Sequence, residues 1–164
     1  MSRNVYLVGM PGSGKSAVGR ALAQRLSLPF VDLDEEVEAS AGAAPAEIFA
    51  EGGEARYREL EKAALSHISA RNRAVVASGG GTVIDPDNRT IMRASGTVIW
   101  LRAPLEYLKR RDLVGSTRPL LRTEADLERL WKEREPIYGE VADHAVDATE
   151  TPEDVADAIL AVLP

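Results

Sequence analysis

The residues best suited to chemistry lie in a glycine-rich loop near the start of the sequence. Gly9 to Ser16, with the letters GMPGSGKS, match the pattern G-x-x-x-x-G-K-[ST] in full. Glycines let the backbone N–H groups of such a loop turn inward around phosphate oxygens, and the following helix adds the partial positive charge of its N-terminus. Lys15 would reach the β- and γ-phosphates, and the Ser16 hydroxyl would ligate Mg²⁺. The loop predicts binding of a nucleoside triphosphate with one Mg²⁺.

This loop alone leaves a kinase, a GTPase and a motor ATPase possible. About 150 residues follow it, which leaves little room for the modules that couple hydrolysis to mechanical work. The Asn-Lys-x-Asp stretch with which GTPases read guanine does not occur in the sequence. These two observations favour a small-molecule kinase.

Two carboxylates follow the second apolar run of the sequence. Residues 29–34 read as a strand, and Asp32 and Asp34 would share one face of it at its carboxyl end. Phosphoryl transfer needs one carboxylate near the metal and one near the acceptor hydroxyl. The alternative is that Asp34 caps a helix that begins at Glu35. A cap role would not exclude a function.

Two further clusters have both a functional and a structural interpretation. Gly79-Gly80-Gly81, the glycine turn, follows a third strand and favours close approach of a substrate to the backbone, although a plain tight turn is the alternative. Glu54 and Glu61 lie four residues before and three after Arg58, so both acids could hold its guanidinium on one helix. The alternative for that cluster is an exposed ladder of ion pairs.

The remaining segments alternate between apolar runs and amphipathic stretches. Strands are predicted at 5–8, 29–34, 74–78 and 97–101, with a weak fifth at 145–147; helices are predicted at 16–26, 35–41, 44–69 with a break at Gly52-Gly53, 87–94, 104–112, 124–141 and 152–163. This order predicts one domain with a parallel sheet between two layers of helices, an α/β/α fold. Residues 112–123 lack periodicity and contain Arg118, which suits a mobile lid better than a core element.

Composition limits the partners and the compartment. The chain has 164 residues, 45% of them apolar, and no cysteine, which excludes disulfides and thiolate chemistry. The N-terminus lacks the features of a signal peptide, no apolar run is long enough to span a bilayer, and the net charge of -6 opposes binding to nucleic acids or anionic membranes. We expect a cytoplasmic monomer that holds any anionic substrate with a local basic cluster.

Taken in order, these segments resemble those of the shikimate kinases. The resemblance covers nearly the whole chain and rests on Gly9–Ser16, Phe30–Asp34, Ile48-Phe49, Gly53–Glu61, Gly79–Gly81, Arg118–Leu121 and Arg134–Tyr138. It implies a P-loop NTPase fold of the nucleoside monophosphate kinase-like branch, with a five-stranded parallel sheet. It also implies that the γ-phosphate of ATP passes to the 3-hydroxyl of shikimate, a step that leads toward chorismate and the aromatic amino acids.

The resemblance assigns roles to individual residues of this sequence. It implies an acceptor-binding helical segment at about 34–61 and a lid at about 112–123. For catalysis it implies Lys15, Asp34 and Arg118, with Ser16 and Asp32 serving the Mg²⁺. For ATP it implies Gly12, Ser13, Gly14, Lys15, Ser16, Ala17 and Arg118, with the adenine between Arg111 and Pro152. For shikimate it implies Asp34, Arg58, Gly80, Gly81 and Arg134, with Phe49, Tyr57 and Glu61 lining or supporting the pocket.

The sequence departs from the family pattern at Tyr57, where phenylalanine is commoner, and at Glu150, where some members carry a basic residue. The added Tyr57 hydroxyl needs a partner. The rival interpretations are another kinase of the same branch, such as a gluconate kinase-like enzyme or a nucleotide kinase, and a nucleotide-binding module without catalysis. The arginine pair Arg58 and Arg134 opposes the first, and intact Lys15, Asp32 and Asp34 oppose the second.

Overall fold

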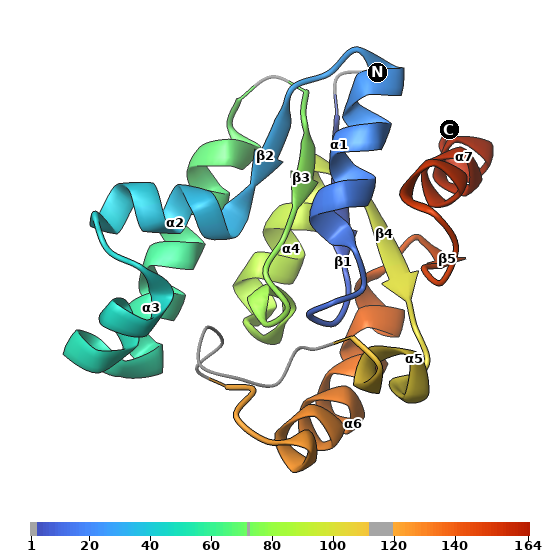
Figure 1. Cartoon of the computed structure of the whole chain (residues 1–164). Coiled ribbons are helices and arrows are strands. Elements are labelled where there is room, and N and C mark those ends of the chain that lie inside the picture. The colour runs from blue at the N-terminus through green and yellow to red at the C-terminus, as the bar shows by residue number, and fades with distance from the viewer. Residues whose placement is uncertain (1–2, 72, 112–119) are drawn as a thin grey trace.

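The centre of the protein is a parallel sheet of five strands in the order β2-β3-β1-β4-β5 (Figure 1). We describe residues 3–71, 73–111 and 120–164 of a computed structural model. The strands are β1 (Asn4–Val8), β2 (Phe30–Asp32), β3 (Val75–Ala77), β4 (Gly96–Arg102) and β5 (His144–Asp147). In the central strand Val5 pairs with Val75 of β3 and with Thr97 of β4. The predicted parallel sheet is confirmed, and so is its weak fifth strand.

Helices cover both faces of this sheet. They are α1 (Lys15–Leu26), α2 (Leu33–Ala41), α3 (Pro45–Ser69), the 3₁₀-helix η1 (Thr82–Ile84), α4 (Pro86–Ser95), α5 (Leu105–Lys109), α6 (Glu124–Val141) and α7 (Pro152–Val162). α1 and α7 pack together on one face, while α4 and α6 contact β4 from the other (Figure 1). The predicted three-layer α/β/α architecture is confirmed.

Apolar side chains form two separate buried clusters. The larger one lies between the sheet and its helices and includes every residue of β1 from Val5 to Val8. A strand buried on both faces reads as an uninterrupted apolar run, which is why this segment of the sequence has no alternation. The smaller cluster consists of Val37, Ile48 and Tyr57 and joins α2 to α3, which pack against each other beside β2.

The predicted second strand is two residues too long. β2 ends at Asp32, and α2 begins at Leu33. The Asp32 carboxylate accepts hydrogen bonds from the backbone N–H groups of Asp34 at 3.0 Å and Glu35 at 3.3 Å, so Asp32 is the N-cap of the helix. Asp32 and Asp34 therefore do not share a strand face. The alternative cap at Asp34 is also wrong, because the cap lies two residues earlier.

The break predicted in the long helix is present at Gly53. Its φ of 71° and ψ of -171° interrupt α3 with a conformation that residues other than glycine rarely adopt. The part of α3 before the break contains Phe49, and the part after it contains Tyr57, Arg58 and Glu61. The two parts of α3 therefore run in different directions, and each contributes its own side chains.

A sheet glycine gives a stability prediction. The β-carbon of alanine at Gly96 would lie 2.8 Å from Tyr6 Cε2 and 2.9 Å from the carbonyl carbon of Asn4, inside the pairing of β1 with β4. We expect Gly96→Ala to lower the free energy of unfolding by about 2 kcal/mol, as overpacking does. Urea unfolding measures this change.

The matched control for Gly96→Ala is Gly139→Ala in α6. A β-carbon there meets only Trp100 Cζ3 at 3.5 Å, which is ordinary van der Waals contact. Because alanine is the better helix former, this variant is expected to gain up to about 1 kcal/mol. Equal effects of the two variants would contradict the steric account.

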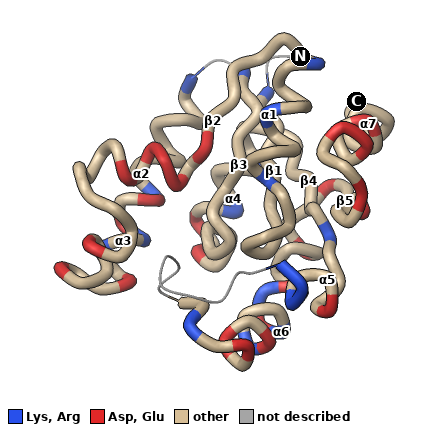
Figure 2. Tube along the Cα trace, in the orientation of Figure 1, with Lys and Arg blue, Asp and Glu red and all other residues tan. Residues whose placement is uncertain are grey.

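Charges are distributed unevenly over the fold. Figure 2 shows acidic residues on α2 and α7, and a basic run where α5 ends. No helix within the described ranges is both long enough and apolar enough to cross a membrane. The surface of α2 is acidic. The basic side chains that enter the interior beside α2 are therefore the groups in this region that could bind an anion.

Candidate active site

A cavity of about 540 Å³ lies where β1, β2 and β3 end. Ligands of open α/β sheets bind at this edge, beside the point where the strand order reverses. The residues that line the cavity are Pro11, Gly12, Gly14, Lys15, Ser16, Ala17, Asp32, Asp34, Glu38, Pro45, Phe49, Tyr57, Arg58, Glu61, Ser78, Gly79, Gly80, Gly81, Arg111, Leu120, Leu121, Leu130 and Arg134. One cavity therefore collects most of the predicted nucleotide and acceptor residues.

The glycine-rich loop forms one end of the cavity. Gly9, Gly12 and Gly14 have positive φ angles, and Gly14 is the N-cap of α1. Lys15 is buried, and its Nζ donates hydrogen bonds to the carbonyl oxygens of Gly9 at 2.8 Å and Met10 at 2.9 Å. These bonds hold the ammonium group over the loop, at the N-terminus of the helix. That arrangement suits an anion with several phosphate oxygens.

A hydroxyl and a carboxylate meet beside this loop. The Ser16 hydroxyl donates to Asp32 Oδ2 at 2.7 Å, while Asp32 Oδ1 caps α2. Ser16 comes from the first turn of α1, which follows β1, and Asp32 comes from the end of β2, so groups beyond the carboxyl ends of two strands meet here. Both atoms are hard oxygen donors of the kind that Mg²⁺ prefers.

The glycine turn forms the floor between the two ends of the cavity. A β-carbon at Gly79 would lie 2.9 Å from Asp34 Oδ1, and one at Gly80 would lie 2.8 Å from Pro11 Cδ. At Gly81 it would lie 2.8 Å from the Arg58 guanidinium carbon. Close packing on three sides is thus a physical reason for three successive glycines.

A buried carboxylate organises the far end of the cavity. Glu61 is fully buried and accepts hydrogen bonds from Arg58 Nη1 at 2.9 Å and from the Thr82 hydroxyl at 2.8 Å. Glu54 lies 3.3 Å from Arg58 Nη2 on the more exposed side. The predicted grip of two acids on one guanidinium is confirmed, and the exposed ladder is wrong because Glu61 lies in the interior. Burial raises the pKa of Glu61, and the charge of Arg58 opposes that shift.

Arg134 enters the same cavity from α6. Its side chain is only 3% exposed, and its Nε has no hydrogen-bond partner among the described residues. A β-carbon at Gly80 would lie 3.1 Å from its Nη1, so the guanidinium lies against the glycine turn. Tyr138, one helical turn further along, donates a hydrogen bond to the Gly80 carbonyl, and burial raises its pKa to about 12. The Tyr138 hydroxyl therefore keeps its proton at neutral pH and can act as a hydrogen-bond donor.

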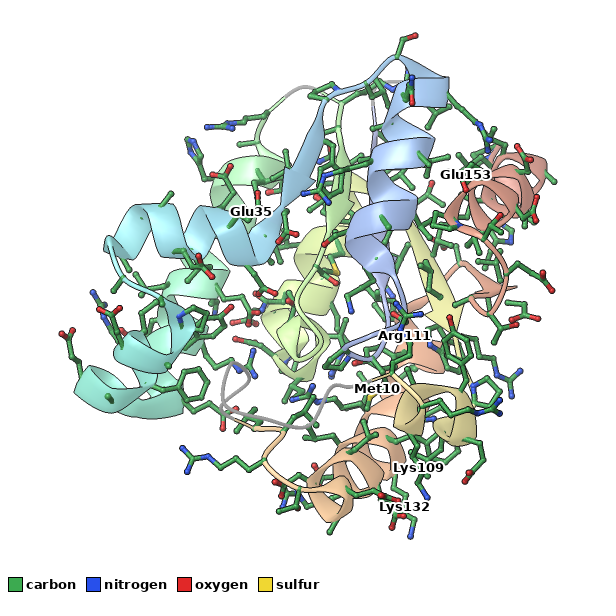
Figure 3. All side chains as sticks on the ribbon, in the orientation of Figure 1. Met10, Glu35, Lys109, Arg111, Lys132 and Glu153 are labelled. Atoms are coloured by element: carbon green, nitrogen blue, oxygen red, sulfur yellow. The ribbon has the colours of Figure 1, made fainter. Side chains whose placement is uncertain are left out.

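The two residues predicted to hold the adenine differ in their relation to the cavity. Arg111 lines the cavity, and its Nη1 donates to the Tyr107 hydroxyl at 2.9 Å. Figure 3 shows Arg111 at the same end of the sheet as Met10 of the glycine-rich loop. Pro152 begins α7 and is absent from the cavity lining. Arg118 and residues 112–119 of the predicted lid lie outside the described residues.

Comparison with known proteins identifies the family. The family model for shikimate kinase matches residues 11–164. The chain belongs to the shikimate kinase family. The predicted resemblance is confirmed by curated relatives, among them shikimate kinases from Synechococcus sp. (strain CC9605) and Bordetella pertussis. The first is 48% identical over 99% of this chain and 83% of that protein; the second is 43% identical over 98% and 76%.

Solved structures agree with this assignment to the shikimate kinase family. The shikimate kinase from Acinetobacter baumannii in complex with shikimate has a TM-score of 0.92 and 37% identity, over 96% of this chain and 90% of that one. A gluconokinase from Sinorhizobium meliloti has a TM-score of 0.65 and 20% identity, over 97% of this chain and 90% of that one. The second likeness shows a shared fold alone.

Sequence reasoning missed several residues of this shikimate kinase family site. Pro11 and Tyr138 pack on or bond to Gly80, and the Ser78 hydroxyl donates to the Leu7 carbonyl at 2.7 Å, which ties β3 to β1. Tyr138 follows Arg134 by four residues, so helical spacing could have indicated it. The contacts of Pro11 and Ser78 cross between strands, and no local pattern encodes them.

The buried Glu61 gives a prediction about pH. Its folded pKa is raised above the ordinary value of 4.5, so its stabilising contribution is present below that pH and is lost as pH rises through the folded pKa. We therefore expect the free energy of unfolding of the wild type, minus that of Glu61→Gln, to decrease as the pH rises from 4 to 7. Urea unfolding at successive pH values measures this difference.

The control for this pH prediction is Glu59→Gln. Glu59 is exposed on the same helix, and its variant is expected to differ from the wild type by an amount that varies less with pH. If the Glu61→Gln difference grew with pH instead, attraction to Arg58 would outweigh burial. The sign of the change of this difference with pH decides whether burial of Glu61 or its attraction to Arg58 is the larger effect.

Proposed function

We propose that this protein transfers the γ-phosphate of ATP to the 3-hydroxyl of shikimate and yields shikimate 3-phosphate and ADP. Membership of the shikimate kinase family supports the reaction class. The observation that carries the proposal is the single cavity, which joins the glycine-rich loop to Arg58, Arg134 and Asp34. A triphosphate bound at one end would present its last phosphate to an acceptor at the other.

The acceptor end has the groups that shikimate requires. Shikimate has one carboxylate and three hydroxyls, so its site needs guanidinium forks for the first and carboxylate or backbone groups for the others. Arg58 and Arg134 supply two forks, which bind carboxylate groups bidentately. Asp34, with Gly80 and Gly81, supplies the partners for hydroxyls. The rings of Phe49 and Tyr57 and the buried Glu61 would shape and support this end.

The proposed chemistry is direct in-line transfer without a phosphoenzyme. Asp34 would orient the acceptor hydroxyl and accept its proton as the new oxygen–phosphorus bond forms, while the bond from the γ-phosphorus to the oxygen of the β-phosphate breaks and ADP leaves. Lys15 would neutralise charge on the transferring phosphoryl group, and we assign the same role to Arg118. Closure of the segment at about 112–123 would exclude water and so suppress wasteful hydrolysis of ATP.

We assign one Mg²⁺ to a position beside the phosphates of bound ATP. The hydroxyl of Ser16 and the carboxylate of Asp32, which lie 2.7 Å apart, are the residues that would hold it, directly or through water. When bound, the ion would neutralise phosphate charge and fix the geometry of the triphosphate. Lys15 would supply the protein's own positive charge beside the same phosphates. Gly12, Ser13, Gly14 and Ala17 would hold the triphosphate through the loop and α1, and Arg111 would contact the adenine, with Pro152 on its other side.

The remaining proposals concern the compartment, the oligomeric state, the partners and the acceptor-binding segment. We propose a cytoplasmic monomer with no nucleic-acid or membrane partner, because the net charge of -6 repels such polyanions. Segment 34–61 is proposed to bind the acceptor. An anionic substrate would then depend on the local field of Arg58 and Arg134 and not on the overall charge.

An assay of ADP release tests the proposed reaction. Purified protein receives ATP and Mg²⁺ with shikimate, gluconate or a nucleoside monophosphate in parallel, and Lys15→Met serves as the blank. We expect ADP only with shikimate. ADP release with gluconate or a nucleotide and none with shikimate would overturn the proposal in favour of another kinase of this fold. If the protein bound the nucleotide but released no ADP with any of the acceptors, the interpretation as a non-catalytic module would be favoured.

A further inference from the structure

The hydroxyl that distinguishes Tyr57 from phenylalanine has a partner in the cavity. It donates a hydrogen bond of 2.6 Å to Asp34 Oδ1. Tyr57 is 6% exposed and comes from the second part of α3, while Asp34 lies in the first turn of α2. The bond therefore joins two helices across the acceptor end of the cavity, and a carboxylate acceptor makes it a strong one.

The ring of Tyr57 is fixed independently of this bond. It lies against the Phe49 ring with a centroid separation of 5.3 Å, and the Arg58 guanidinium carbon lies 5.5 Å from its centroid. Val37 and Ile48 pack in the same small cluster. Because packing sets the position of the ring, the hydroxyl can set the position of the carboxylate to which it donates.

The direction of the bond is also fixed. Burial and the charge of Asp34 both raise the pKa of Tyr57, so the hydroxyl keeps its proton at all ordinary pH values. It can therefore donate to the Asp34 carboxylate at neutral pH.

Other charged groups surround the same carboxylate. Arg58 and Glu61 face it from α3, and Asp32 precedes it at the cap of α2. Arg134 reaches the adjacent glycine turn from α6. The Tyr57 hydroxyl is the neutral group that touches Asp34 directly, so removing it tests this one bond without changing the charge of the site.

We propose that Tyr57 is a positioning residue for Asp34: it engages Oδ1, so that Oδ2 is presented to the hydroxyl of the acceptor. This inference rests on the proposed function, in which Asp34 orients that hydroxyl and takes its proton. Tyr57 itself does not need to touch the reacting atoms. Its contribution is the direction of the carboxylate.

Tyr57→Phe removes the hydroxyl and retains the ring. At saturating substrates we expect kcat to fall about tenfold, while the KM for shikimate changes less than about threefold, because one strong hydrogen bond to a charged group is lost. Steady-state kinetics at neutral pH measure both quantities.

The matched control is Tyr6→Phe. The Tyr6 hydroxyl is also buried and lies 2.6 Å from the Ser95 hydroxyl, but Tyr6 does not line the cavity. This variant should lose stability and keep both the wild-type kcat and the wild-type KM for shikimate. The second comparison is made in Asp34→Asn, where adding Tyr57→Phe should lower kcat no further. A kcat of Tyr57→Phe equal to that of the wild type, or an equal loss of kcat in both backgrounds, would overturn the proposal.

A measurement without turnover separates this inference from the proposed function. Nuclear magnetic resonance of ¹³C-labelled aspartate at neutral pH follows the carboxyl carbon of Asp34, whose signal is assigned by its loss in Asp34→Asn. The chemical shift of this signal should change in Tyr57→Phe and stay in place in Tyr6→Phe. An unchanged chemical shift would overturn the role of Tyr57. A change in a protein that is inactive toward shikimate would leave that role and overturn the reaction.

Discussion

Replacing Lys15 with methionine is expected to lower kcat about a thousandfold, the size of effect seen when a preorganised group that stabilises transition-state charge is removed. The methionine side chain has nearly the same length but no charge. In the wild type two carbonyl oxygens, of Gly9 and Met10, hold the ammonium over the loop. Charge developing on the transferring phosphate would therefore lose a preorganised partner.

Two measurements distinguish this loss from damage to the fold. Calorimetric titration with shikimate should give Lys15→Met the dissociation constant of the wild type, because the acceptor end does not include Lys15. Lys132→Met, on the exposed part of α6 (Figure 3), should retain kcat within twofold. A kcat of Lys15→Met within tenfold of the wild type would remove Lys15 from the catalytic machinery.

Replacing Arg134 with methionine is expected to raise the KM for shikimate about 100-fold, which corresponds to about 3 kcal/mol for a lost bidentate bond to a carboxylate. The KM for ATP should change little. The ion pairs of the described residues do not include Arg134, whose guanidinium is buried. A buried charge without a paired carboxylate costs stability. The ligand-free variant is therefore expected to unfold at a higher urea concentration than the wild type.

The control for Arg134 lies on the same helix. Arg129 is exposed and lies 3.3 Å from the carboxylate of Asp126. Arg129→Met should alter neither the shikimate KM nor the midpoint of unfolding by a large amount. If Arg134→Met lost stability and kept its KM, the guanidinium would be a structural element of α6 and not a part of the acceptor site.

The sequence predicts the fold and the phosphate end of the site well because both depend on local patterns. The glycine-rich loop needs only eight successive residues between a strand and a helix, and the apolar run of β1 follows from burial on both faces. The end of β2 was harder to predict. Whether Asp32 continues a strand or caps a helix depends on where pairing with β3 stops, and that register is not local.

The acceptor end depends on contacts between distant segments. Tyr57 meets Asp34 only because α2 and α3 fold against each other, and Arg134 approaches the glycine turn from the opposite part of the chain. The helical spacing of Glu54, Arg58 and Glu61 did predict their pairing. It could not predict that Glu61 is buried, since that depends on Thr82 and the turn before it.

The two separate apolar clusters have an energetic consequence. The free energy of local opening scales with the buried contacts that must be broken, and the cluster of Val37, Ile48 and Tyr57 is much smaller than the one around the sheet. Leu33 of α2 and Leu65 and Ile68 of α3 belong to the larger cluster and keep the far ends of these helices on the sheet. The part of α2 and α3 around the smaller cluster can therefore open without melting the strands that carry the glycine-rich loop. An acceptor bound between α3 and the glycine turn would close that opening. This part would then be weakly protected in the resting protein and well protected in the loaded one.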